Sequence, residues 1–180
     1  MISEARLPEG TRAFLWPVLP IDRETLRAAY EDLSPESRNR RFLSSVPHLT
    51  EAMLDHLAGE VDGVDHVALA LVVLDEDNVG TPVGVARMIR YRDRPTDADL
   101  AVTVLDPWQG RGVATALLPE LLRQRPGGVR RIVTTVAADN TASLAMLRRL
   151  GEVTVTPAGI DRLDVVVDLD EPEASTEESS

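Results

Sequence analysis

The sequence contains no cysteine and no lysine among its 180 residues. Without cysteine, the chain can form no disulfide framework and offers no thiol nucleophile. All 19 basic residues are arginine. The protein therefore has no lysine side chain of its own that could be acylated.

Long apolar runs are also missing. No segment approaches the roughly 20 apolar residues that a membrane-spanning helix needs. Residues 1–15 carry charge from Glu4 onward and lack the uninterrupted apolar core of a signal peptide. The composition, 43% hydrophobic and 27% charged, is typical of a soluble globular protein. We therefore expect a cytoplasmic protein with no membrane partner.

The chain has no excess of positive charge. Its formal net charge is −11, which argues against nucleic acid as a partner because phosphate binding needs a basic surface. An acidic protein favours cationic substrates. The acids are dense at the C-terminus, where residues 169–180 contain several acids and no base. We expect one domain over residues 1–168 and an acidic disordered tail over residues 169–180.

Hydrophobic periodicity and capping signals predict the order of the elements. Strands are expected at residues 11–19, 66–74, 82–90, 97–105, 130–136, 152–156 and 160–168. Helices are expected at residues 23–33, 35–42, 51–57, 113–125 and 140–150, with Asp22, Ser34 and Thr50 as N-caps of the first three. This order predicts an α/β (α+β) fold, with a mixed central sheet of about six to seven strands flanked by helices.

A glycine-containing turn, Gln109-Gly110-Arg111-Gly112-Val113-Ala114, lies between an expected strand and an expected helix. Small residues let the backbone approach a ligand closely, and the N–H groups at a helix N-terminus attract phosphate. Arg111 adds a full positive charge. The spacing matches neither a Walker A loop nor a dinucleotide-binding fingerprint. A structural turn with an arginine on the surface is the alternative interpretation.

Two sequence blocks carry a family resemblance. Residues 102–114 resemble the acetyl-CoA motif of the GNAT superfamily, Gln/Arg-x-x-Gly-x-Gly/Ala, and residues 139–151 resemble the helix that follows it in that family. The resemblance implies a GNAT fold and acetyl-CoA as cosubstrate, with no metal. It assigns Val102, Thr103 and Val104 to the pantetheine arm. It assigns Gln109, Gly110, Arg111, Gly112, Val113, Ala114 and Thr115 to the pyrophosphate. Asn140 would touch the cofactor, although it is also a preferred helix N-cap.

Asp99 is the candidate catalytic base. Acyl transfer needs a neutral amine, and a lysine with a pKa of about 10.4 is only roughly 0.1% free base or less at neutral pH. Residues 98–104, and the early segment 33–42, look like the bacterial protein lysine acetyltransferase (Pat) group of GNAT enzymes, in which a glutamate stands at the Asp99 position. Aspartate is one methylene shorter, which a water relay would bridge. The alternative is a charge on an edge strand in solvent.

A general acid is not assigned. Many GNAT enzymes have a tyrosine seven residues after the Asn140 position, and this chain has Leu147 there. A thiol with a pKa of about 8.5 leaves readily as thiolate, so the reaction can proceed without a tyrosine as general acid. His48, His56 and His66 are too scattered to indicate a metal site and are interpreted as surface or loop residues.

These features predict an acetyl-CoA-dependent N-acetyltransferase acting on a primary amine. A protein lysine is the first candidate acceptor and a small-molecule amine the second. A non-catalytic acyl-CoA-binding regulatory module is the third hypothesis, favoured by Leu147 and by the aspartate at position 99. The protein is expected to be a monomer or a homodimer.

Overall fold

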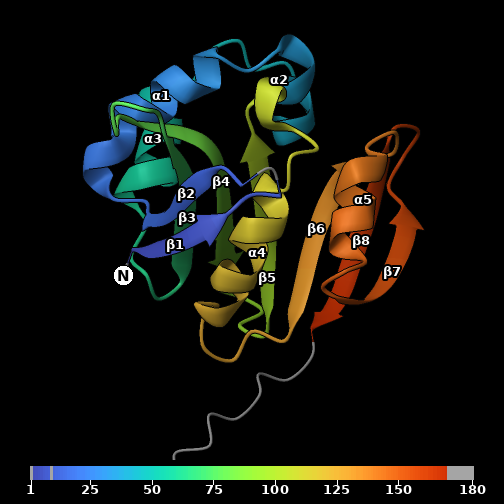
Figure 1. The fold of residues 1–180 in the computed structure, drawn as a ribbon. Helices are drawn as coiled ribbons and strands as arrows, with labels where there is room; N and C mark the ends of the chain where they lie inside the picture. The colour runs from blue at the N-terminus through green and yellow to red at the C-terminus, as the bar shows by residue number, and fades with distance from the viewer. Residues whose placement is uncertain (1, 9, 170–180) are drawn as a thin grey trace, which may run out of the picture.

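The computed structural model describes residues 2–8 and 10–169. These residues form one eight-stranded sheet with the order β1-β2-β3-β4-β5-β6-β8-β7. All neighbouring strands are antiparallel except β5 and β6, which are parallel. The strands are β1 (Ser3–Arg6), β2 (Arg12–Pro17), β3 (His66–Leu74), β4 (Gly80–Arg90), β5 (Asp97–Val104), β6 (Arg131–Ala137), β7 (Gly151–Pro157) and β8 (Arg162–Leu169), as Figure 1 shows.

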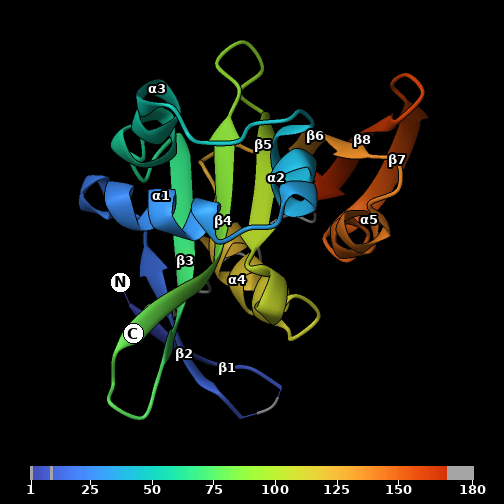
Figure 2. The ribbon, with the colours of Figure 1, turned by 90° about the horizontal axis from the view of Figure 1, so that it is seen from above.

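Helices cover both faces of this sheet. One face carries α1 (Arg23–Glu31), α2 (Pro35–Phe42), α3 (Glu51–Leu54) and the π-helical turn Asp55–Gly59 that follows α3. The other face carries α4 (Val113–Arg123) and α5 (Thr141–Leu147) (Figure 2). Two short 3-10 turns, Pro20–Asp22 and Asp106–Trp108, precede α1 and the glycine turn. The predicted mixed sheet with flanking helices is confirmed, and the expected six to seven strands approximate the eight observed.

The hydrophobic core lies in two parts, one on each face of the sheet. The larger part packs α4 and α5 against the sheet, and its fully buried members include Leu117 and Leu121 of α4. The smaller part lies under α1 and α3 and includes Tyr30 and Leu54. A strand with helices on both faces needs apolar residues throughout, which explains the nearly continuous apolar run of β3.

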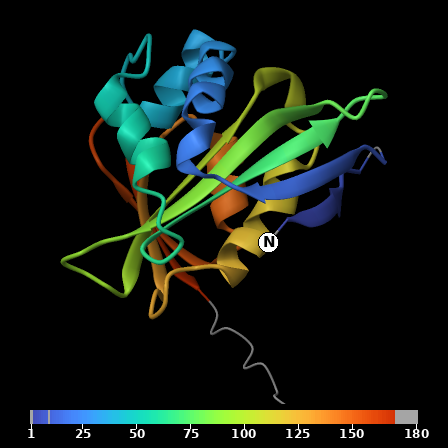
Figure 3. The ribbon, with the colours of Figure 1, turned by 90° about the vertical axis from the view of Figure 1, so that its left-hand side faces the viewer.

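The sheet is twisted. In Figure 3 the green strands β3 and β4 cross at an angle to the orange strands behind them. A bulge in β4, where the register with β3 shifts between Leu71 and Val72, adds to the local twist.

Two of the three expected N-caps are confirmed. The Ser34 hydroxyl accepts a hydrogen bond from the Ser37 N–H at 3.2 Å, and the Thr50 hydroxyl accepts one from the Met53 N–H at 3.2 Å. The expectation for Asp22 is wrong, because its carboxylate accepts from the Leu19 N–H at 2.8 Å instead. Asp22 belongs to the 3-10 turn that runs directly into α1, so its side chain serves that turn.

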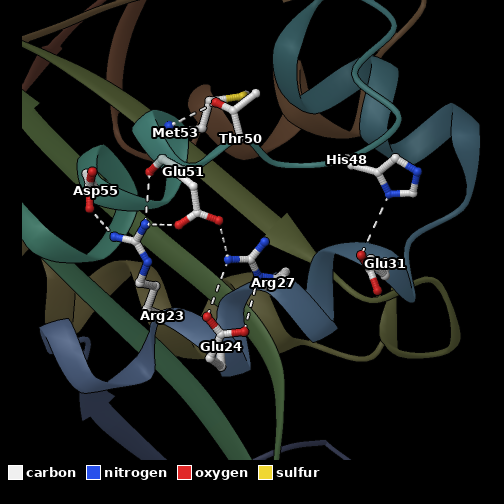
Figure 4. A network of polar contacts seen from close by, with 9 residues as sticks. All are labelled: Arg23, Glu24, Arg27, Glu31, His48, Thr50, Glu51, Met53 and Asp55. Atoms are coloured by element: carbon white, nitrogen blue, oxygen red, sulfur yellow. Dashed lines mark hydrogen bonds and ion pairs between the residues drawn. The ribbon is translucent and has the colours of Figure 1, made fainter.

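Ion pairs join α1 to α3 (Figure 4). Arg27 contacts the Glu51 carboxylate at 2.7 Å and also pairs with Glu24. Arg23 pairs with both Glu51 and Asp55. Hydrogen bonds from Arg27 and then Arg23 lower the pKa of Glu51. The carboxylates are mostly solvated, so each pair adds little stability, but together the pairs link α3 and the turn after it to α1.

Three further expectations need correction or fall outside the described residues. β1 was not expected, because its short polar sequence Ser-Glu-Ala-Arg gives a weak strand signal at the edge of a sheet. His66 is a buried residue of β3 with 4% exposure, so the interpretation as a surface or loop residue is wrong. β8 continues through Leu169, and the rest of the expected acidic tail lies outside the described residues.

Candidate functional site

The sheet opens between β5 and β6. The two strands pair only at Asp97↔Arg131 and Ala98↔Ile132, and beyond these pairs they diverge (Figure 1). An ion pair closes the narrow end of this fork, with the Asp97 carboxylate 2.8 Å from the Arg131 guanidinium. Asp97 is only 1% exposed, whereas the Arg131 side chain is 46% exposed, so the pair joins a buried carboxylate of β5 to the surface of β6. From residue 99 onward, one edge of β5 lacks a neighbouring strand among the described residues.

Strand alternation decides which backbone groups of β5 face the fork. The Thr96 carbonyl accepts from the Arg130 N–H at 2.8 Å, on the β6 side. The Asp97 carbonyl accepts from the Tyr91 N–H at 3.0 Å, on the β4 side. Because successive residues of a strand present their backbone groups to opposite neighbours, the even-numbered residues of β5 face β6.

Val102 and Val104 therefore present their backbone N–H and C=O groups to the fork. The Val104 carbonyl accepts from the Gln109 side-chain amide at 3.2 Å, which fits this direction. The backbone of Thr103 faces β4, where Thr103 pairs in register with Val85. The three residues expected to hold the pantetheine arm thus differ, because two offer backbone groups to the fork and Thr103 does not.

The glycine turn lies directly after β5. Gly110 and Gly112 have φ angles of 73° and 84°, in the left-handed region that glycine adopts without strain. The first helical bond of α4 runs from the Ala116 N–H to the Gly112 carbonyl at 3.0 Å. The N–H groups of residues 113–115 (Val113, Ala114 and Thr115) therefore have no acceptor within the helix. They provide donors and a partial positive charge beside the open end of the fork.

Close packing fixes the start of α4 on the sheet. Val113 is 1% exposed, and a Cβ atom added to Gly84 of β4 would lie 2.5 Å from its Cγ1. Only a glycine at position 84 lets this turn of the helix lie so close to β4. In the turn itself, the Arg111 guanidinium lies over the Trp108 ring at 4.1 Å, which keeps this positive charge beside the glycines.

Asp106 joins the glycine turn to α2. Its carboxylate accepts from the Ser34 N–H at 3.0 Å, from the Ser34 hydroxyl at 2.8 Å and from the Ser37 hydroxyl at 2.8 Å. The Gln109 amide also donates to the Ser37 hydroxyl at 3.1 Å. Burial alone would raise the pKa of Asp106, but the hydrogen bonds from Ser34 and Ser37 outweigh it and lower the pKa. Sequence reasoning missed this residue, although Asp106-Pro107 directly precedes the glycine motif.

On the far side of the fork, α5 begins at Asn140. The Asn140 side-chain oxygen accepts from the Ser143 N–H at 3.1 Å, so the interpretation of Asn140 as a helix N-cap is confirmed, while its contact with the cofactor stays a prediction. Leu147, which stands where many GNAT enzymes have a tyrosine, is 1% exposed and packs in the core. Its side chain packs in the core and cannot protonate a departing thiolate.

The even-numbered side chains of β5 pack in the core with α4 and α5. The odd-numbered side chains of β5 therefore point to the other face of the sheet, which α1, α2 and α3 cover. Two cavities lie there. One, of about 430 Å³, is lined mostly by apolar side chains and reaches Thr103. The other, of about 380 Å³, reaches Asp99. Asp99 is half-buried and pairs with Ile89 of β4, while its strand has no pairing with β6 at that residue, so it is not a fully solvated charge.

Two arginines line both cavities. Arg87 of β4 is 5% exposed, and burial together with the nearby Arg41 charge lowers its pKa to about 9. Its Nη1 donates to the Leu57 carbonyl at 2.8 Å and lies 3.3 Å from His66 Nε2. Burial and the Arg87 charge lower the pKa of His66 to about 4, so this histidine is neutral at pH 7. Burial also lowers the pKa of Arg41, and the Asp99 charge opposes that effect.

Comparison with known proteins identifies the family. The sequence matches the model of the acetyltransferase (GNAT) family over residues 26–151. The chain belongs to the GNAT acetyltransferase family. Its relatives include acetyltransferase Pat of Mycolicibacterium smegmatis, 37% identical over 147 residues, which are 81% of this chain and 43% of that protein. The chain thus spans less than half the length of this relative. Acetyltransferase PA5475 of Pseudomonas aeruginosa is 30% identical over 82% of this chain and 78% of that protein.

Solved structures agree with the GNAT assignment. The GNAT domain of PAT from S. lividans superposes with a TM-score of 0.81 at 27% identity, covering 93% of this chain and 97% of that one. The protein yncA from Salmonella typhimurium, solved with acetyl-CoA, has a TM-score of 0.67 at 19% identity, covering 90% of this chain and 96% of that one, and supports the fold alone. The predicted GNAT family and the likeness to Pat are confirmed.

Within this GNAT fold, the fork and the glycine turn bring together the residues predicted to hold the cofactor between positions 102 and 115, while Asn140 begins α5. Their contacts with a cofactor, and the role of Asp99, stay predictions. The described residues contain no group of three or more histidine, aspartate or glutamate side chains arranged to hold a metal ion. None of their helices is long and apolar enough to span a membrane.

Proposed function

We propose that the protein is an acetyl-CoA-dependent N-acetyltransferase whose acceptor is a primary amine, with a protein lysine as the first candidate. One observation carries this proposal. The open fork of β5 ends against a glycine turn and a helix N-terminus, so backbone groups for an extended arm and donors for a diphosphate follow one another along one short stretch of chain.

The donor half of the proposal follows from the direction of the backbone groups. The N–H groups of residues 113–115, together with the Arg111 charge, suit the pyrophosphate of acetyl-CoA. The fork-facing groups of Val102 and Val104 suit the amide groups of the pantetheine arm, which would bind there as an additional strand. Thr103 would contribute through its side chain, which lines the larger cavity.

The acceptor half depends on Asp99. The amine nitrogen attacks the thioester carbonyl carbon, forming the C–N bond as the C–S bond breaks. The sulfur leaves as a thiolate with the electron pair, and the proton from the amine passes to the Asp99 carboxylate, directly or through a water molecule. Asp99 lines a cavity with room for the amine, and bringing the amine and the thioester together supplies much of the acceleration.

A small-molecule amine is the second candidate acceptor. Cavities of about 430 and 380 Å³ under the helical layer have the size of small-ligand sites. A panel containing both lysine peptides and small amines therefore separates the two classes of acceptor.

The test measures release of free CoA from acetyl-CoA in the presence of each amine. The wild type should release CoA only when an acceptor amine is present. Replacing the base, Asp99→Asn, should lower kcat about 10²–10⁴-fold while acetyl-CoA binding is retained. Asp99→Glu should keep part of the activity, because it preserves the carboxylate. Asp93→Asn is the matched control, since Asp93 is exposed in the loop before β5.

Two results would contradict the proposal in different ways. An unchanged kcat for Asp99→Asn would remove Asp99 as the base. No turnover with any amine, alongside micromolar binding of acetyl-CoA, would instead favour a non-catalytic acyl-CoA-binding module.

A further inference from the structure

The cavity at Asp99 contains more positive than negative charge. Its charged lining residues are Arg41 and Arg87, which face one carboxylate, that of Asp99. His56 also lines the cavity. The protein as a whole has a net charge of −11, so this local excess of positive charge runs against the rest of the molecule.

Arg87 is buried without a carboxylate partner. Among the described residues, no carboxylate oxygen lies within 4 Å of its guanidinium, whose Nη1 donates to the Leu57 carbonyl. This bond and the contact with His66 both use Nη1, so the guanidinium of a residue that lines the cavity has further N–H donors. Burying a charge without a counter-ion is costly, which makes this arrangement unfavourable unless an anion completes it.

Arg41 of α2 is half-buried, and the carboxylate whose charge acts on it is that of Asp99. It lines the same cavity, and it forms no ion pair or hydrogen bond with any described residue, although its guanidinium lies 4.7 Å from the centre of the Phe42 ring. Its neighbour Arg40 differs, because Arg40 pairs with Glu36 at 2.7 Å and does not line the cavity. The charge of Arg41 also contributes to the lowered pKa of Arg87, which places the two guanidinium groups near one another.

We infer that the acceptor amine carries an anionic group, a carboxylate in the simplest case, which binds between Arg41 and Arg87 while the amine nitrogen lies at Asp99. This inference rests on the proposed acetyltransferase function and names its substrate class. Guanidinium groups bind carboxylates through paired, charge-assisted hydrogen bonds, and a second arginine would balance the remaining charge. The carboxylate has two sources, the α-carboxylate of a free amino acid or an acidic side chain beside a lysine in a peptide.

Matched substrate pairs test this inference. One arm uses ω-amino carboxylates from glycine to 6-aminohexanoate, each compared with its carboxamide. The other arm uses blocked peptides in which a glutamate or a glutamine lies beside the lysine. The carboxylate should have the higher kcat/KM in at least one arm, by roughly 10- to 100-fold and mainly through KM, because a charged hydrogen bond is lost in the amide. The arm that shows the preference identifies the source.

Variants on α2 then locate the preference. Arg41→Gln should bring the carboxylate-to-carboxamide ratio of kcat/KM close to one by raising KM for the carboxylate. Arg40→Gln removes the same charge from the same helix but leaves the cavity unchanged, so it should keep the wild-type ratio. Arg87→Gln should act as Arg41→Gln does, and Arg41→Gln decides the matter if the buried substitution prevents folding.

Thermal unfolding without acetyl-CoA separates this inference from the proposed function. The preferred carboxylate should raise the melting temperature of the wild type and of Arg40→Gln more than its carboxamide does, and this difference should vanish in Arg41→Gln. Equal turnover and equal stabilisation by every carboxylate and carboxamide would overturn the anion site. That result would leave the acetyltransferase function intact if CoA were still released.

Discussion

Acidification should destabilise the protein through one buried residue, His66. Its pKa is lowered from 6.5 to about 4, because burial in β3 and the adjacent Arg87 charge disfavour the imidazolium ion. Between these two values the unfolded chain binds a proton that the folded protein does not. Stability from this residue is therefore complete above pH 6.5 and is lost as the pH falls towards 4. Linkage gives a loss of about 2 kcal/mol between pH 7 and pH 5.

The assay is urea unfolding at a series of pH values from 7 to 5. Within this range the carboxylates with lowered pKa stay ionised in both states, so histidine dominates the slope. His66→Gln should remove most of the loss, whereas His48→Gln should keep it, because the His48 side chain is 75% exposed. An equal loss of stability in wild type and His66→Gln would refute the reasoning, since His66 would then titrate alike in the folded and unfolded states.

Two more predictions concern the packing around the glycine turn. Gly84→Ala brings a Cβ atom to 2.5 Å from Val113. It should lower the unfolding free energy by about 1–3 kcal/mol and weaken acetyl-CoA binding measured by calorimetry, whereas Gly127→Ala, which meets no atom within 4 Å, should change neither. Asp106→Ala should cost about 1–3 kcal/mol in urea unfolding at pH 7, because Ser34 and Ser37 lose their acceptor. Because the folded-state pKa of Asp106 is lowered, this difference should shrink as the pH falls below about 3.9, and a constant difference would contradict the assignment.

Local sequence signals predicted the glycine turn and its neighbouring elements well. The glycine spacing of residues 109–114 predicted a turn between a strand and a helix, and the structure places Gly110 and Gly112 in the left-handed conformation. The apolar run of β3 predicted a buried strand, and helices do cover both of its faces. These features were readable because each depends on residues that are close together in the chain.

Contacts between residues far apart in the chain were not readable from the sequence. Asp106 reaches Ser34 across 72 residues, and Arg87 reaches Leu57 across 30. Nothing in the sequence near Arg41 or Arg87 distinguishes these two arginines, which line the cavity, from the other arginines of the chain. His66 was misread for the same reason, because its neighbours are Arg87 of β4 and His56 of the turn after α3, which only the folded structure brings to it.

Hydrogen exchange with and without acetyl-CoA tests the central claim most directly, because that claim concerns backbone N–H groups. Acetyl-CoA should slow amide exchange over residues 110–115 and in the part of β5 around Val102. S-acetylpantetheine, which lacks the pyrophosphate, should slow exchange in β5 alone. If acetyl-CoA binds while exchange over residues 110–115 stays unchanged, the glycine turn does not hold the pyrophosphate and the account of the site is wrong.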